Sequence, residues 1–340
     1  MDNIKKVLFL DRVHPALDEA LLDMNFKCEY LDEMPGSSVE SIIEGYHGIV
    51  IRSKLKLDQS FLSKATNLKF IARAGAGMEN IDVEYAKSKG IACLKAPEGN
   101  KDAVADHAIG MLLALFNHLH IADSEVRKGF WRREHNRGTE LFEKTVGIIG
   151  FGFTGSEFAK RLSGFNVTVL AHDKYKTGFA DSPVIESSLE DIFERADIIS
   201  LHLPLTNETK FMCNDDFINK FAKNFYIINT SRGKIVKTSD LVKNIESGKI
   251  LGACLDVLEF ESTSFENLRG LSMWINKRGV FINRIARWLI KIGWWKYLHP
   301  AQYLVRSDKV ILSPHVAGWS FESNKRISTI LAERVRELQQ

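Results

Sequence analysis

Three side chains that can exchange a proton or bind an anion follow predicted strands in the second half of the chain. Arg232 stands in NTSRG, Glu261 ends LDVLEFE, and His315 stands in SPHVAG. An imidazole exchanges protons near neutral pH, a carboxylate beside it fixes its tautomer and stabilises its charged form, and a guanidinium binds a carboxylate in bidentate fashion. Each residue alone is as typical of a surface ion pair or a solvated loop. Because ligands bind at the carboxyl ends of parallel strands, the shared position predicts one catalytic site.

A glycine-rich turn precedes these residues in the chain. The sequence KTVGIIGFGFTG places Gly150, Gly152 and Gly155 between an apolar strand and a predicted helix. In this context the glycines allow a tight turn, let the backbone approach a pyrophosphate and let helix and strand pack closely. The N-terminus of the helix then faces the phosphates. A glycine turn that binds nothing is the alternative interpretation, and the order of strand, glycines, helix, strand and acid argues against it.

The acid of that order is Asp173, which ends the next apolar strand, 18 residues after Gly155. A carboxylate there accepts hydrogen bonds from ribose hydroxyls, so we predict NAD as the cofactor. The neighbouring cation, Lys174, would instead suit the 2′-phosphate of NADP. A nicotinamide cofactor beside an imidazole suits the oxidation of a secondary alcohol, in which a hydride leaves carbon and His315 accepts the hydroxyl proton, and it suits the reverse reduction.

Short apolar runs alternate with helical patterns along the whole chain, which predicts an α/β fold with parallel sheets covered by helices. Four runs precede a long helical pattern that begins near Lys101, and six follow it. We therefore expect two doubly wound domains. Residues 1–103 form the first part of one domain, residues 104–316 form the second domain, and the final helix in 317–340 returns to the first.

Composition narrows the class of protein. The 340 residues are 45% hydrophobic and 26% charged, with a formal net charge of +3, so global charge indicates neither nucleic-acid nor membrane binding. The four cysteines form no CxxC pair and no zinc pattern, so we expect reduced thiols and no metal. The N-terminal apolar run is too short for a signal peptide, and no run of 18 apolar residues occurs. A cytoplasmic location is expected.

The motifs together resemble the D-isomer-specific 2-hydroxyacid dehydrogenase family. The resemblance includes ARAGAGMENID, AVADHAIGMLLAL, the glycine turn, NTSRG, LDV with the following glutamate, and SPHVAG, and it covers almost the whole chain except about residues 263–306. It implies a flavodoxin-like substrate domain split around a Rossmann NAD-binding domain, a small D-2-hydroxy acid or 2-keto acid substrate, and a homodimer. By resemblance, Arg232, Glu261 and His315 match the catalytic residues of the family.

The resemblance also implies a set of cofactor contacts beyond the glycines. The positions that match cofactor-contacting residues are Phe153, Thr154, Asp173, Leu203, Thr230 and Asp256. Some members of the fold family are NAD-responsive corepressors that bind partners. A catalytically weak or inactive protein of that kind, or a membrane-associated one, is therefore the alternative function.

Backbone and cationic groups, all but one of them in the first domain, predict how the substrate binds. The N–H groups of Gly75, Ala76 and Gly77 can approach the substrate carboxylate. The candidate contacts to the rest of the substrate are Arg52, Ser53, Arg73 and Arg133. The arginines match positions that face the phosphorylated substrate in short D-3-phosphoglycerate dehydrogenases, which makes 3-phosphoglycerate the first candidate substrate. Ordinary surface ion pairs are the alternative for Arg73 and Arg133, and reduction of glyoxylate or hydroxypyruvate stays open.

One segment does not fit the family pattern. Residues 269–306 contain eight Lys or Arg, no Asp or Glu, and four of the six tryptophans. Three interpretations compete: a helical insertion packed on the body or across a dimer, a basic amphipathic helix on an anionic membrane, and a foreign stretch that disturbs Glu261 and His315. We favour the first, since loop-closure entropy lets sheets accept long insertions between strands.

Overall fold

The computed structural model describes residues 5–34, 38–179, 183–261 and 300–340. The chain divides into two compact units, which are treated separately below. Unit 1 contains residues 1–103 and 318–340, and unit 2 contains residues 104–317.

Unit 1 is built on a five-stranded parallel sheet in the order β2-β1-β3-β4-β5. This is the flavodoxin-like order of a doubly wound sheet. Its elements are β1 (Lys6–Phe9), α1 (Pro15–Asp23), β2 (Lys27–Tyr30), η1 (Leu31–Glu33), α2 (Val39–Ile42), η2 (Ile43–Gly45), β3 (Gly48–Ile51), α3 (Gln59–Leu62), β4 (Phe70–Arg73), α4 (Val83–Ser88), β5 (Ala92–Lys95) and α14 (Phe321–Glu337).

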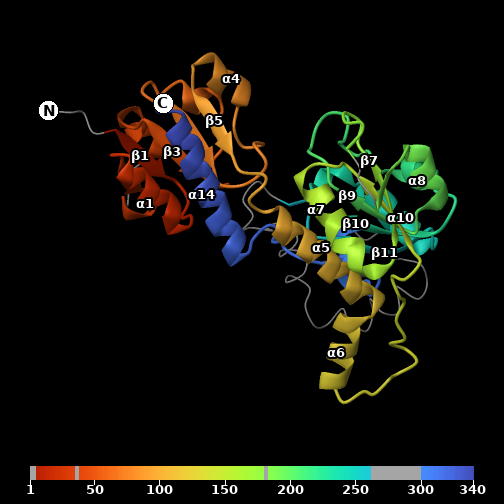
Figure 1. The fold of residues 1–340 in the computed structure, drawn as a ribbon. Coiled ribbons are helices and arrows are strands. Elements are labelled where there is room, and N and C mark those ends of the chain that lie inside the picture. The colour runs from red at the N-terminus through yellow and green to blue at the C-terminus, as the bar shows by residue number, and fades with distance from the viewer. Residues whose placement is uncertain (1–4, 35–37, 180–182, 262–299) are drawn as a thin grey trace. The chain divides into compact units, whose positions relative to one another are not determined.

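The C-terminal helix α14 belongs to unit 1, where it packs beside α1 (Figure 1). Its apolar positions recur at helical spacing, so Ile327, Leu331 and Val335 lie on one face of α14. This face is buried in the same hydrophobic cluster as Leu17 and Leu21 of α1. The helix begins at a capping box in which the Ser320 and Ser323 side chains each accept a hydrogen bond from the other residue's backbone N–H. The last segment of the chain thus completes the core around the first strand.

Unit 2 carries a seven-stranded parallel sheet in the order β12-β11-β10-β9-β6-β7-β8. Counted from β6, this is the Rossmann order extended by one strand. Its elements are α5 (Lys101–Phe116, whose first turn lies in unit 1), α6 (Leu119–Arg127), β6 (Thr145–Ile149), α7 (Phe153–Leu162), η3 (Ser163–Phe165), β7 (Thr168–His172), β8 (Val184–Glu186), α8 (Leu189–Arg195), β9 (Ile198–Leu201), α9 (Asp215–Ile218), β10 (Phe225–Asn229), η4 (Gly233–Ile235), α10 (Thr238–Glu246), β11 (Ile250–Leu255), α13 (Pro300–Arg306) and β12 (Val310–Leu312).

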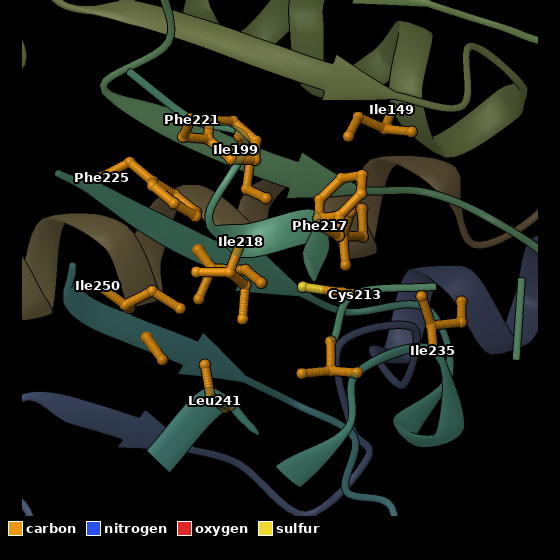
Figure 2. Packing of buried hydrophobic residues seen from close by; sticks show 14 of the residues in the cluster. Ile149, Ile199, Cys213, Phe217, Ile218, Phe221, Phe225, Ile235, Leu241 and Ile250 are labelled. Atoms are coloured by element: carbon orange, nitrogen blue, oxygen red, sulfur yellow. The ribbon is translucent and has the colours of Figure 1, made fainter. Parts of the chain in front are cut away.

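The predicted fold class is confirmed by these two parallel sheets. In unit 2 the β9, β10 and β11 strands are buried on both faces over most of their length, and a phenylalanine cluster packs on one side of them (Figure 2). Phe221 stacks on Phe225 with ring centroids 4.1 Å apart, and Phe217 and Phe193 meet at 5.2 Å edge to face. This packing fixes the sheet whose carboxyl ends carry the predicted catalytic residues.

Two strands were not predicted from the sequence. Both β2 (KCEY) and β8 (VIE) lie at the edge of a sheet and are partly exposed. Two of the four residues of β2 are charged, and β8 has only two apolar residues, so neither forms the longer apolar run by which the other strands were recognised.

Residues 262–299, which hold most of the basic, tryptophan-rich segment, lie outside the described residues. The three interpretations of the segment therefore stay predictions. Its last seven residues are described. Residues 300–306 form α13, in which Ala301 and Leu304 are buried and Leu304 joins the core of unit 2. Their spacing of three places both on one helix face. The end of the segment therefore contributes to the core of unit 2.

Candidate active site

The glycine turn connects β6 to α7 in unit 2, and its geometry requires glycine at two positions. Gly150 has a φ of +93°, and a Cβ there would lie 2.4 Å from the carbonyl oxygen of His202. A Cβ on Gly155 would lie 2.1 Å from the carbonyl oxygen of Gly150. Both distances are shorter than any real contact, so a side chain at either position would separate helix from strand.

Gly152 has a different environment, because a Cβ built there meets no atom within 4 Å. It is the N-cap of α7 and has no side chain to accept from the first N–H groups of the helix. Phe153 and Thr154 form the first turn. The open space in front of these N–H groups suits the pyrophosphate of a dinucleotide. The sequence-predicted cofactor residues 150–155 therefore fit the group they are expected to hold.

Asp173 follows β7 and is tied to the same turn. Its carboxylate accepts hydrogen bonds from the N–H of Phe151 at 2.9 Å and from the N–H of Tyr175 at 3.0 Å. Each oxygen keeps a second lone pair for a ribose hydroxyl. Through the hydrogen bond from Phe151, the Asp173 carboxylate also holds the backbone of the glycine turn in place.

The neighbouring cation, Lys174, is paired with a residue that the sequence did not indicate. Its Nζ lies 2.7 Å from Oε2 of Glu208, which also accepts a hydrogen bond from the Tyr175 hydroxyl at 2.7 Å. The ammonium lowers the pKa of Glu208, and the carboxylate raises the pKa of Lys174. The positive charge of Lys174, which would suit a 2′-phosphate, is thus paired with the carboxylate of Glu208.

Leu203 follows β9, and its Cδ2 lies 3.0 Å from the position of a Cβ on Gly150, so it packs against the glycine turn. The residue before it, His202, is buried and its Nε2 is 2.8 Å from the Ser200 hydroxyl. Burial lowers the pKa of His202 to about 4, so this imidazole is neutral at physiological pH. It supports the turn and is a poor candidate for acid–base chemistry.

Arg232 follows β10 in a loop held by Asn229, a residue with no exposed surface. The Asn229 side chain donates to the carbonyl of Arg232 at 3.0 Å and accepts from Ser231. One guanidinium nitrogen, Nη1, donates to the carbonyl of Ser231 at 2.7 Å. A Cβ on Gly233 would lie 2.0 Å from the carbonyl oxygen of Leu258, so this loop packs directly on the segment that leads to Glu261.

Thr230, in the same loop, has a buried hydroxyl with no hydrogen-bond partner among the described residues. Buried hydroxyls are normally satisfied, so this one suits a polar group of a bound ligand. The observation fits the expected cofactor contact at Thr230.

His315 and Glu261 form a hydrogen-bonded pair. Nδ1 of the imidazole lies 3.0 Å from Oε2 of the carboxylate, and the two side chains are 25% and 21% exposed. The residues are 54 positions apart in the chain, so the pair forms across the atypical segment. An ionised carboxylate accepts only, so Nδ1 carries a proton and proton exchange with a ligand falls to Nε2.

The loop that carries His315 is fixed by Asp256. His315 has a φ of +56°, an uncommon conformation for a residue with a side chain. The Asp256 carboxylate, only 1% exposed, accepts from the Ser313 hydroxyl at 2.6 Å and from the N–H groups of Val316 and Ala317 at 2.9 and 2.8 Å. The carboxylate of Asp256 therefore positions the histidine loop, and its predicted contact with the cofactor stays a prediction.

The candidate substrate residues of unit 1 lie at the carboxyl ends of β3 and β4. Arg73 is paired in register with Ile51, the residue before Arg52. The Arg73 guanidinium lies where a Cβ on Gly75 would be, and Gly75 has a φ of +153°. The glycine turn that continues through Ala76 and Gly77 is therefore adjacent to a cation.

Arg52, Ser53 and Arg133 have other surroundings. The backbone N–H groups of Arg52 and Ser53 both donate to one carboxylate oxygen of Asp11, at 2.7 and 3.1 Å. Arg133 is exposed on the segment after α6, and no hydrogen bond or ion pair within the described ranges links its side chain to Arg232 or His315.

Comparisons with known proteins show what this chain is similar to. Residues 109–317 match the family model described as "D-isomer specific 2-hydroxyacid dehydrogenase, NAD binding domain". The chain is 34% identical over 287 residues to a hydroxypyruvate reductase of Thermotoga maritima, covering 84% of this chain and 83% of that protein. It is 31% identical to a D-3-phosphoglycerate dehydrogenase of Archaeoglobus fulgidus, covering 94% of this chain and 55% of that protein.

The chain thus spans about half the length of the D-3-phosphoglycerate dehydrogenase it matches. Among solved structures it is similar to the D-lactate dehydrogenase of Aquifex aeolicus in complex with NAD and lactic acid, with a TM-score of 0.76 and 29% identity, covering 98% of this chain and 95% of that one. No helix in the described part of the chain has the length and apolar character needed to cross a membrane.

Proposed function

The chain belongs to the D-isomer-specific 2-hydroxyacid dehydrogenase family, and on that premise we propose that it transfers a hydride between NAD(H) and C2 of a small D-2-hydroxy acid or 2-keto acid. The observation that carries the proposal is the His315–Glu261 pair at 3.0 Å, in the same unit as a glycine turn that fits a dinucleotide. When bound, NAD supplies the hydride acceptor. The residues of the chain supply the proton acceptor and the substrate contacts.

His315 is the general base in alcohol oxidation and the general acid in ketone reduction. Its Nε2 takes the hydroxyl proton as the hydride leaves C2, and it returns the proton in the opposite direction. Glu261 holds the Nδ1–H, keeps the imidazole in the required tautomer and stabilises the imidazolium that forms. Arg232 binds the substrate carboxylate and polarises the reacting oxygen.

NAD is held by the groups around the turn of unit 2. The N–H groups of the first α7 turn, at Phe153 and Thr154, face the pyrophosphate. Asp173 accepts from the adenosine ribose, and the unsatisfied Thr230 hydroxyl is a further contact. Unit 2 is therefore the dinucleotide-binding domain of the proposal, and unit 1 the substrate-binding domain.

For the substrate, the arginines of unit 1 favour an acid with a second anionic group. Arg52 and Arg73 end neighbouring strands, and the turn at 75–77 offers backbone N–H groups beside them. 3-Phosphoglycerate is the first candidate, and hydroxypyruvate or glyoxylate are the candidates with one anionic group.

A panel assay tests the proposed function. Purified protein with NAD is assayed for NADH formation on D- and L-isomers of lactate, glycerate and 3-phosphoglycerate, and with NADH on the matching 2-keto acids. Turnover of a D-isomer and little of its L-isomer is expected. Tight NAD binding without turnover of any acid would contradict the proposal and favour a corepressor-like role.

The cofactor preference gives a second test. Wild-type protein should show a higher kcat/KM with NAD than with NADP, because the Asp173 carboxylate repels a 2′-phosphate and Glu208 neutralises Lys174. Asp173→Ser should narrow this ratio about tenfold or more, since like charges placed together in a binding site cost several kcal/mol. Glu208→Gln should narrow it by about two- to fivefold, the range of an exposed ion pair. Equal use of both cofactors by the wild type would contradict the assignment of Asp173.

We further propose that the protein is a homodimer joined through α6 and the segment after it. Helix α6 buries no residue, and its ribbon projects from the sheet of unit 2 in Figure 1. Apolar side chains on it and beyond it are exposed, among them Leu119 (55%), Val126 (52%) and Trp131 (80%). Exposed apolar side chains at this density favour a partner surface.

Light scattering after size exclusion tests the dimer. Trp131→Glu should raise the dimer Kd by at least about 30-fold, since a buried interface tryptophan contributes about 2 kcal/mol or more. Phe321→Glu, at a position 93% exposed in unit 1, is the control and should leave the dimer intact. A wild-type protein that is monomeric at micromolar concentration would contradict this proposal.

A further inference from the structure

Arg52 in unit 1 is held in place by an aromatic ring. Its guanidinium carbon lies 3.9 Å from the ring centroid of Trp319, a residue of the segment just before α14. Trp319 is 46% exposed and belongs to none of the hydrophobic clusters of the core. Core packing therefore does not account for this large apolar side chain, whereas contact with the guanidinium does.

The backbone of Arg52 is fixed as well. One oxygen of the Asp11 carboxylate accepts from three consecutive N–H groups, those of Arg52 at 2.7 Å, Ser53 at 3.1 Å and Lys54 at 3.3 Å. The loop after β3 is thus bound to the end of β1. The backbone and the guanidinium of Arg52 are thus both held in place before a ligand binds, which lowers the conformational entropy lost on binding.

A second stacked arginine in unit 1 shows what is unusual about Arg52. Arg12 lies 3.9 Å from the ring centroid of Tyr30, and its nitrogens also bind the carboxylates of Asp32 at 2.9 Å and Glu33 at 2.6 Å. The Arg52 guanidinium has no carboxylate within salt-bridge distance in the described part of the chain. Its positive charge is oriented by Trp319 but not neutralised.

Stacking determines which side of the guanidinium can bind. A ring over one face of the planar group leaves the N–H donors at its edge, where they can make paired hydrogen bonds to a phosphate or carboxylate. Arg52 follows Ile51, the register partner of Arg73, so both arginines stand at the carboxyl ends of the neighbouring strands β3 and β4. An anion bound there meets a preformed cationic site.

We propose that Trp319 is a positioning residue that orients Arg52 to bind the second anionic group of the substrate, the group other than the C1 carboxylate. The inference rests on the proposed function, since it places Arg52 at the substrate. It makes the substrate class a 2-hydroxy acid with a phosphate or carboxylate on C3.

The test compares 3-phosphoglycerate with D-glycerate, which differ only in the phosphate. Trp319→Leu should raise the ratio of the KM for 3-phosphoglycerate to the KM for D-glycerate about fivefold, the upper range of an exposed cation–π contact. Trp319→Phe retains a ring and should restore most of the preference. Arg52→Gln should raise the ratio further, and adding Trp319→Leu to it should have no additional effect, because the ring acts only through the arginine. Phe321→Leu removes an exposed ring nearby and is the control.

Calorimetry provides the same comparison without turnover. The Kd of 3-phosphoglycerate for the NAD-saturated protein should rise about fivefold in Trp319→Leu. If the wild type turns over no acid yet this Kd rises, the proposed function fails and the role of Trp319 stands. An unchanged ratio and an unchanged Kd in Trp319→Leu, or an equal loss of kcat with both acids, would overturn the inference.

Discussion

Replacing His315 by alanine is expected to lower kcat by about 10²–10⁴-fold in both directions of the reaction, the usual contribution of a positioned acid–base group. The imidazole can both accept and donate a proton, and its partner Glu261 fixes its tautomer. Alanine removes the proton acceptor. Neither the sheet nor the glycine turn depends on this side chain, so the Kd of NAD should stay within about twofold.

Glu261→Gln separates the two parts of the pair. The amide still occupies the site but its charge no longer stabilises the imidazolium, so kcat should fall less than in His315→Ala. Alcohol oxidation needs Nε2 of His315 without a proton, and ketone reduction needs Nε2 with one. A His315→Ala protein with undiminished turnover would remove the histidine from the proposed mechanism.

Most of the fold and the glycine turn between β6 and α7 could be predicted from local sequence patterns. The β6–α7 turn was predictable because its glycines, the strand before them and the acid after β7 lie within about 30 residues, and each has a local physical reason. The apolar runs predicted the buried strands for the same reason. The edge strands β2 and β8 were missed because their residues are partly exposed and follow no apolar pattern.

Contacts between residues distant in the chain could not be read from the sequence. Glu208 lies 34 positions from Lys174, and nothing near Lys174 indicates that it is paired. The stacking of Arg52 on Trp319 joins a loop after β3 to the start of the C-terminal helix. Asp256 follows a strand end, and nothing near it in the sequence indicates that its carboxylate accepts hydrogen bonds from the N–H groups of Val316 and Ala317.

The two glycines of the turn that face different environments should respond differently to the same added methyl group. Gly152→Ala should leave the free energy of unfolding unchanged, because a Cβ there meets no atom within 4 Å and the backbone is in the β region. The methyl group would instead enter the space assigned to the pyrophosphate. We expect the Kd of NAD to rise about 10–100-fold, the equivalent of 1.4–2.8 kcal/mol of steric conflict.

Gly155→Ala should lower both the free energy of unfolding and the affinity for NAD. Its Cβ would lie 2.1 Å from the carbonyl oxygen of Gly150, a backbone atom that cannot rotate away, so α7 must move off β6. We expect a loss of about 1–3 kcal/mol in the free energy of unfolding, measured by urea denaturation, together with weaker NAD binding measured by calorimetry. Gly164→Ala is the matched control. A Cβ on Gly164, like one on Gly152, meets no atom within 4 Å, and Gly164 lies in η3 rather than in the turn. If Gly155→Ala were as stable as Gly164→Ala, helix–strand contact would not be what requires glycine. If Gly152→Ala bound NAD as tightly as the wild type, the space before α7 would not hold the pyrophosphate.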